Sequence, residues 1–174
     1  MNKQYYPALD EHLYTAVLPN GLTVMVNRKK GFSKKLCYFT VDFGAIHRNF
    51  TFEGRKYEVP AGIAHYLEHK MFELPGRDVT AEFAELGVNV NAFTSYDMTA
   101  YHISCTDHFP QALQLLLEFV STPYFTAESV AREQGIIAQE IGMSADEPSG
   151  RCFEDLMEIL YEKHPIRVPI LGTE

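Results

Sequence analysis

The feature that most constrains this chain is the stretch His65-Tyr66-Leu67-Glu68-His69. On a helix, residues four positions apart share one face, so His65 and His69 can hold one metal ion between them. Glu68 lies next to that face, where a carboxylate can accept a proton from metal-activated water without being a ligand itself. The stretch therefore predicts a helix that carries part of a metal site.

The residues around this stretch favour a helix over residues 61–72. Pro60 stands near its start, where a missing N–H costs nothing, and Leu74-Pro75-Gly76 ends it. Ile63 and Met71 contribute to an apolar surface beside the histidines. One side of this helix should therefore be buried.

Composition limits the possible partners. The chain has 174 residues, 46% of them apolar, which is enough for one domain or for one half of a repeated pair. A net charge of −8 argues against a nucleic-acid partner. No apolar run is long enough to span a bilayer, and no signal peptide is evident at the start, so we expect no membrane association. Three cysteines without a C-x-x-C pair predict buried free thiols in a cytoplasmic protein.

Strand signals occur in two parts of the chain. Residues 14–18 and 22–26 flank Asn20-Gly21, a strong hairpin signal. Residues 36–43 carry apolar side chains on both sides of the expected strand and predict a strand covered on much of both faces. A polar loop is expected at residues 49–59. The last extended segments, 88–95 and 99–106, complete the predicted strands.

Helix signals alternate with these strands. Asp78 and Asp107 are candidate N-caps, Thr126 begins a helix that runs to about Met143, and a last helix is expected over residues 153–161. This order predicts an α+β fold, with helices packed on one face of a largely antiparallel sheet.

A third metal ligand is expected on the helix that begins at Thr126. Glu133 and Glu140 are two helical turns apart and share a face. Glutamates on a helix are most often solvated. However, Ile136 and Ile137 predict that this helix is embedded in a core, which would leave few directions facing water.

The remaining histidines are weaker candidates. His47, His102 and His108 have no partner at helical spacing, whereas His12 and His164 are most simply surface or loop residues.

These residues carry a resemblance to a known family. The order His-x-x-Glu-His is a zinc-peptidase signature. Together with the later glutamates it resembles the pitrilysin family of zinc metallopeptidases, which includes insulin-degrading enzyme and the mitochondrial processing peptidase. The similar segments, in family order, are residues 60–73, 91–95, 132–140 and 164–172. Bacterial processing-protease-like members are the most similar.

The resemblance implies roles for individual residues. His65, His69 and Glu140 would bind one Zn²⁺, with Glu68 as the general base. Glu133 would contact one of the metal-binding residues without binding the metal itself. Two imidazoles and a carboxylate leave a fourth position for water, and a carboxylate that accepts the spare imidazole N–H fixes a ligand's orientation.

The resemblance also implies a substrate site at Asn91, Ala92 and Phe93. These residues match an edge strand that binds a peptide substrate, or an unfolded polypeptide segment, through main-chain hydrogen bonds. From residue type alone, an ordinary core strand with Phe93 packed inside is the alternative.

For the domain organisation, the resemblance implies that residues 1–174 are most of the first, catalytic half, a metallohydrolase half-domain as in the mitochondrial processing peptidase. A second half of the same protein, or a homologous subunit, would close over it. Residues 1–174 alone should then be inactive and expose apolar surface. The alternative function is a non-catalytic scaffold subunit of a peptidase complex, and the intact motif favours the enzyme.

Overall fold

The computed structural model describes residues 1–173, and the chain divides into two compact units, one of Met1–Lys34 and one from Lys35 onward. The first unit is an antiparallel sheet in the order β1-β2-β3, formed by β1 (Asn2–Tyr6), β2 (Glu11–Val17) and β3 (Thr23–Asn27). The hairpin predicted around Asn20-Gly21 is confirmed, with Gly21 at a φ of 88°. β1 was not predicted, because residues 2–6 lack the alternation of apolar and polar residues that marks a half-buried strand. All five residues are exposed.

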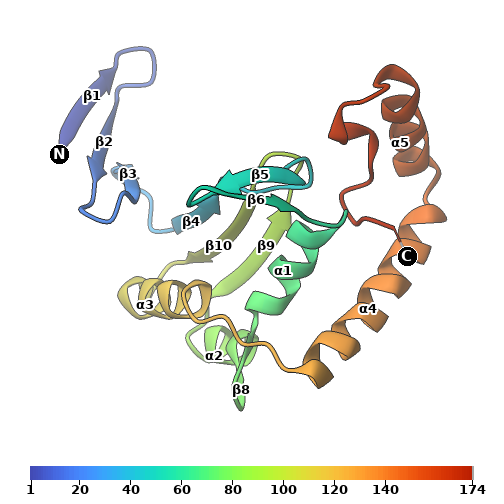
Figure 1. The fold of residues 1–174 in the computed structure, drawn as a ribbon. Helices are drawn as coiled ribbons and strands as arrows, with labels where there is room; N and C mark the ends of the chain where they lie inside the picture. Colours follow the sequence, from blue (N-terminus) through green and yellow to red (C-terminus); the bar gives the residue numbers. More distant parts are fainter. Residues whose placement is uncertain (174) are drawn as a thin grey trace. The chain divides into compact units, whose positions relative to one another are not determined.

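The second unit contains the sheet that positions the candidate site (Figure 1). Its strands are β4 (Lys35–Val41), β9 (Asn89–Thr94) and β10 (Thr99–Cys105), antiparallel in the order β4-β10-β9. The central strand β10 pairs through His102 with Tyr38 on one side and Asn91 on the other. β9 therefore lies at an edge of this sheet.

Helices α2 (Val79–Glu85) and α3 (Phe109–Val120) pack on one face of the sheet. Their side chains form the core together with the inward-facing residues of the strands. Large members of this core include Phe83, Tyr101, Ile103, Leu116 and Phe119. The predicted α+β class, with helices on an antiparallel sheet, is confirmed.

One expectation for β4 is wrong. Cys37 and Phe39 pack against the core, but Leu36 is 58% exposed and Tyr38 is 51% exposed. The strand was expected to be covered on much of both faces because it carries apolar side chains on both sides. The side chains of Leu36 and Tyr38 instead lie on the face of the sheet opposite the helices.

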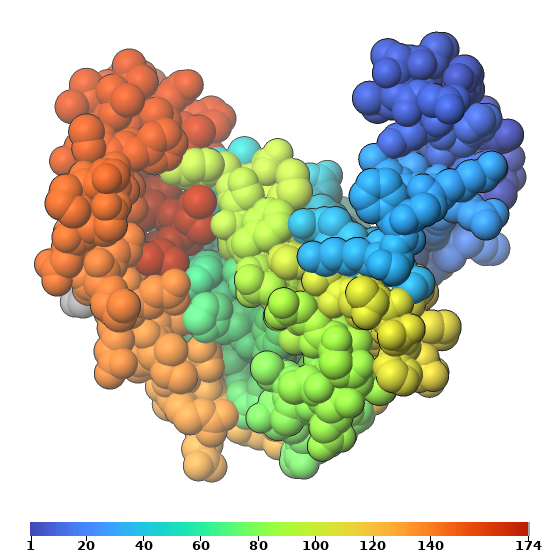
Figure 2. All heavy atoms as spheres, turned by 180° about the vertical axis from the view of Figure 1, so that it is seen from behind, coloured from blue at the N-terminus to red at the C-terminus, as the bar shows by residue number. Residues whose placement is uncertain are grey.

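Helix α1 (Ile63–Met71) carries the motif, as predicted. It begins after Gly62, whose φ of 81° favours glycine. A Cβ atom at Gly62 would lie 2.4 Å from the carbonyl oxygen of Leu171. In Figure 2, red C-terminal residues accordingly lie beside the green residues of α1. The start of α1 is thus seated against residues far away in the sequence.

Two connecting segments differ from expectation. The predicted loop at residues 49–59 is a hairpin of β5 (Asn49–Phe52) and β6 (Arg55–Glu58), because Glu53 and Gly54 both adopt positive φ in a tight turn. Asp107 does not cap α3. The N-cap is His108, which has a φ of 57° and makes no capping hydrogen bond through its side chain.

The cap of α2 was predicted correctly. Asp78 accepts a hydrogen bond from the Ala81 N–H at 3.1 Å. Asp78 is also the last residue of the short hairpin of β7 (Glu73–Leu74) and β8 (Arg77–Asp78).

The C-terminal helices are α4 (Ala127–Ala145) and α5 (Pro148–Leu160), followed by the short 3₁₀ helix η1 (Pro165–Arg167). Thr126 caps α4 as predicted. The expectation that α4 is embedded is wrong: Ile137 is buried, but Ile136 is 46% exposed. Only one side of α4 packs against α1.

Two smaller expectations fail at this end of the chain. α5 starts at Pro148 rather than at residue 153, because the Glu147 carboxylate caps its first turn. Cys152 is exposed, whereas Cys105 is buried and Cys37 is half-buried; all three are free thiols. Within residues 1–173, no helix is both long and apolar enough to cross a membrane.

Candidate metal centre

Three predicted ligands converge between α1 and α4. The imidazoles of His65 and His69 have ring centroids 4.5 Å apart. Oε2 of Glu140, on α4, lies 3.7 Å from Nε2 of His65 and 3.5 Å from Nε2 of His69. One potential ligand atom from each residue lies within 4.8 Å of the others. Two helices distant in sequence thus bring together the donor set expected for a metal.

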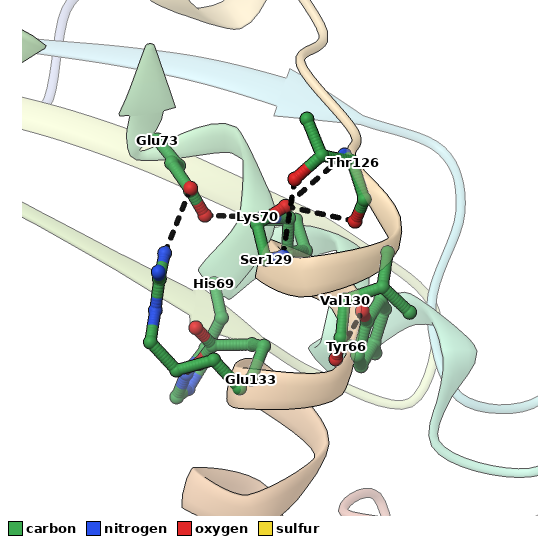
Figure 3. A network of polar contacts seen from close by, with 9 residues as sticks. Tyr66, His69, Lys70, Glu73, Thr126, Ser129, Val130 and Glu133 are labelled. Carbon is green, nitrogen blue, oxygen red and sulfur yellow. Dashed lines mark hydrogen bonds and ion pairs between the residues drawn. The ribbon is translucent and has the colours of Figure 1, made fainter. Parts of the chain in front are cut away.

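Another glutamate of α4, Glu133, contacts one of the histidines. Oε1 of Glu133 lies 2.8 Å from Nδ1 of His69 (Figure 3). With Nδ1 engaged in this way, Nε2 of His69 is the nitrogen that faces Glu140. A carboxylate partner on the other ring nitrogen is the usual support of a metal-binding histidine.

Glu68 is buried and accepts a hydrogen bond from a side chain on the sheet. The Thr94 hydroxyl, at the end of β9, donates to its Oε2 at 2.7 Å. Glu68 lies between the two histidines in sequence, but it contacts Thr94 on β9, whereas the histidines face Glu140 on α4. Sequence reasoning did not single out Thr94, and its only signal was its place directly after Phe93.

The environment keeps His65 in the form that binds metals. Burial lowers the pKa of His65, and this effect outweighs the opposing attraction of the Glu140 carboxylate. A neutral imidazole is therefore favoured near neutral pH. The buried Nδ1 of His65 has no hydrogen-bond partner among the described residues.

The donor set fits zinc. Two imidazoles and one carboxylate are a ligand set of catalytic zinc sites, which keep a further position open for water or substrate. No other group of three such side chains meets this geometry in residues 1–173. His47 instead accepts a hydrogen bond from the Gly44 N–H at 2.9 Å, and the ring of His102 lies 4.9 Å from that of Tyr38.

Asn91, Ala92 and Phe93 lie on the edge strand β9, which packs against α1. Phe93 is 42% exposed, so it is not the core residue that its type alone would suggest. The Asn91 side chain accepts a hydrogen bond from the Ala92 N–H at 2.9 Å. The strand thus runs beside the helix that carries the histidines.

The fold and the site define an α+β protein with an inverted His-x-x-Glu-His motif at a candidate metal site. The chain belongs to the insulinase family, peptidase family M16, whose model matches residues 53–174. The resemblance to zinc proteases of this type is thereby confirmed.

Individual relatives agree with this assignment. The uncharacterized zinc protease YmfH of Bacillus subtilis (strain 168) is 44% identical over 97% of this chain, and an uncharacterized zinc protease of Rickettsia felis is 31% identical over 95%. A crystal structure from Alicyclobacillus acidocaldarius, described as an M16-like peptidase, superposes with a TM-score of 0.90 at 41% identity. It matches 94% of this chain. The chain spans 40%, 39% and 38% of the length of these three relatives, respectively.

Proposed function

We propose that the full-length protein is a zinc-dependent endopeptidase that hydrolyses peptides or unfolded polypeptide segments. The observation that carries this proposal is the convergence of His65, His69 and Glu140, whose ligand atoms lie within 4.8 Å of one another. These residues would hold one Zn²⁺, and Glu133 would orient His69. Zinc bound there would act as a Lewis acid on the peptide carbonyl and lower the pKa of a water molecule to about 7.

Glu68 supplies the proton transfer in this proposal. Its Oε2 accepts the hydrogen bond from Thr94, so we assign the proton to Oε1. The carboxylate takes a proton from the attacking water and then, as an acid, gives it to the leaving amine. Burial of the carboxylate beside β9 limits competing contacts with bulk water.

The edge strand β9 provides the substrate-binding part of the proposal. A peptide that adds to residues 91–93 would gain main-chain hydrogen bonds with little demand on its sequence. A second half of the same protein, or a homologous subunit, would complete the site around residues 1–174. The free thiols are compatible with a cytoplasmic location.

Metal dependence of peptide cleavage tests the proposal. We expect the full-length protein to cleave a fluorogenic peptide, to lose this activity on treatment with a chelator, and to regain it with stoichiometric zinc. If the zinc-loaded protein cleaves no peptide in a diverse library, the alternative of a non-catalytic scaffold subunit replaces the enzyme.

A further inference from the structure

Lys70 is a fully buried charged residue that the proposed chemistry does not use. Its side chain, next to His69 on α1, is 0% exposed. The ammonium group pairs with the Glu73 carboxylate and donates a hydrogen bond to Oγ of Ser129 at 2.8 Å. The ring of Phe125 lies 5.9 Å from its Nζ atom. Lysine is rarely fully buried unless it is paired, so these contacts define a specific site for it.

The Ser129 hydroxyl connects Lys70 to the first turn of α4 (Figure 3). It accepts a second hydrogen bond from the Thr126 N–H at 3.1 Å and donates its proton to the Thr126 carbonyl at 3.2 Å. Two accepted bonds and one donated bond use the full capacity of a hydroxyl. Lys70 is therefore bound to the capped end of α4.

Two further contacts continue the α1–α4 interface. The Tyr66 hydroxyl donates to the Val130 carbonyl at 3.2 Å, and His69 meets Glu133. Ser129 and Glu140 are eleven residues apart, or roughly 16 Å along a helix. Over that length, a tilt of about 10° at the Ser129 end would move the Glu140 carboxylate by roughly 3 Å. Ligand groups need placement to within about 0.5 Å.

We propose that Lys70 is a positioning residue for the metal site. By anchoring the start of α4 to the end of α1, it fixes the register and angle at which Glu133 and Glu140 meet the two histidines. Arg132 also pairs with Glu73, at 2.8 Å, but its side chain is largely exposed and does not reach the buried contact with Ser129. The inference rests on the proposed zinc site.

The test is the zinc affinity of Lys70→Met in the full-length protein, measured by competition with a chromophoric chelator. We expect a loss of about 10- to 100-fold, as for other residues that support metal ligands. Lys70→Met removes one partner of an ion pair, which destabilises a protein when the other charge is left unpaired. Glu73 keeps its ion pair with Arg132, which limits this loss. In a Glu133→Ala/Glu140→Ala background, where α4 no longer contacts the histidines through these residues, Lys70→Met should change zinc affinity by less than about twofold.

This cycle separates positioning from a general structural role. If Lys70→Met lowers zinc affinity by the same factor in the wild-type and the Glu133→Ala/Glu140→Ala backgrounds, the inference is overturned, because Lys70 then acts within α1 alone. Zinc affinity of Lys70→Met within about twofold of wild type would also overturn it while leaving the proposed site intact. Absence of zinc binding by the wild-type protein would overturn both the proposed zinc site and the positioning role of Lys70.

Two further variants complete the design. Ser129→Ala removes the α4 partner of Lys70 and should weaken zinc binding in the same direction; it decides the question if Lys70→Met does not fold. Arg77→Met is the matched control, because Arg77 is an exposed cation paired with Glu82 and Glu118. It should leave zinc affinity unchanged.

Discussion

The hydroxyl of Thr94 donates a 2.7 Å hydrogen bond to Oε2 of Glu68. This bond joins the end of the edge strand β9 to the middle of α1. The strand proposed to bind the peptide and the carboxylate proposed to accept the proton are therefore held together by one direct contact. It also determines which carboxylate oxygen remains for proton transfer.

Removing this hydroxyl should slow catalysis without removing zinc. A hydrogen bond to a charged group contributes about 1.5–3 kcal/mol, so we expect Thr94→Val to lower kcat about tenfold or more. Thr94→Ser retains the donor and should stay close to wild type. Steady-state kinetics and zinc content measure the two effects, and a Thr94→Val enzyme with wild-type kcat would show that the bond has no catalytic role.

Glu133 should support zinc binding through His69. The 2.8 Å contact between Oε1 and Nδ1 holds the imidazole in place. Glu133→Ala should therefore weaken zinc affinity about 10- to 100-fold. The exposed neighbour Gln134 provides the control, and Gln134→Ala should leave the affinity unchanged. Equal affinities of the two variants would remove Glu133 from the site.

The metal-free protein should lose stability in acid through His65. Burial lowers the pKa of this imidazole below its usual 6.5, so the unfolded chain takes up the proton at a higher pH than the folded chain. This contribution to stability is complete above about pH 6.5 and is lost as pH falls toward the folded-state pKa. Urea unfolding in the presence of a chelator should show a smaller acid-induced loss for His65→Asn than for wild type. Equal losses would contradict the prediction.

The start of α1 should not tolerate a side chain at Gly62. Its φ is 81°, and a Cβ atom would lie 2.4 Å from the Leu171 carbonyl oxygen. We expect Gly62→Ala to lower the free energy of unfolding by about 2 kcal/mol or more. Gly142→Ala is the control, because nothing lies within 4 Å of a Cβ there. Because Gly142 lies within a helix, Gly142→Ala should raise the free energy of unfolding by about 0.5–1 kcal/mol. A Gly62→Ala protein that is more stable than the Gly142→Ala protein would contradict this account.

Local patterns explain what could be predicted from the sequence. The α1 helix and the hairpin at Asn20-Gly21 depend on neighbouring residues, and both were identified. The approach of Glu140 to the histidines is a contact between distant segments. The prediction that Glu140 lies near the histidines therefore depended on the family resemblance as well as on helical spacing.

The missed features depend on tertiary packing or on unusual backbone conformations. Lys70 and Thr94 acquire their contacts only when α1 packs against α4 and β9, so their positions in the sequence carry no signal. The N-cap of α3 is His108 in the left-handed region, which residue preference at Asp107 did not indicate. The tight turn at Glu53-Gly54 was hidden within a polar segment.

The central claim separates two adjacent residues, Glu68 as the proton acceptor and His69 as a ligand. Zinc content and cleavage of one fluorogenic peptide, measured together on full-length Glu68→Gln and His69→Ala, test it most directly. We predict that Glu68→Gln keeps most of its zinc while losing nearly all activity, whereas His69→Ala loses both. Equal loss of zinc in the two variants, or substantial activity in zinc-loaded Glu68→Gln, would contradict it.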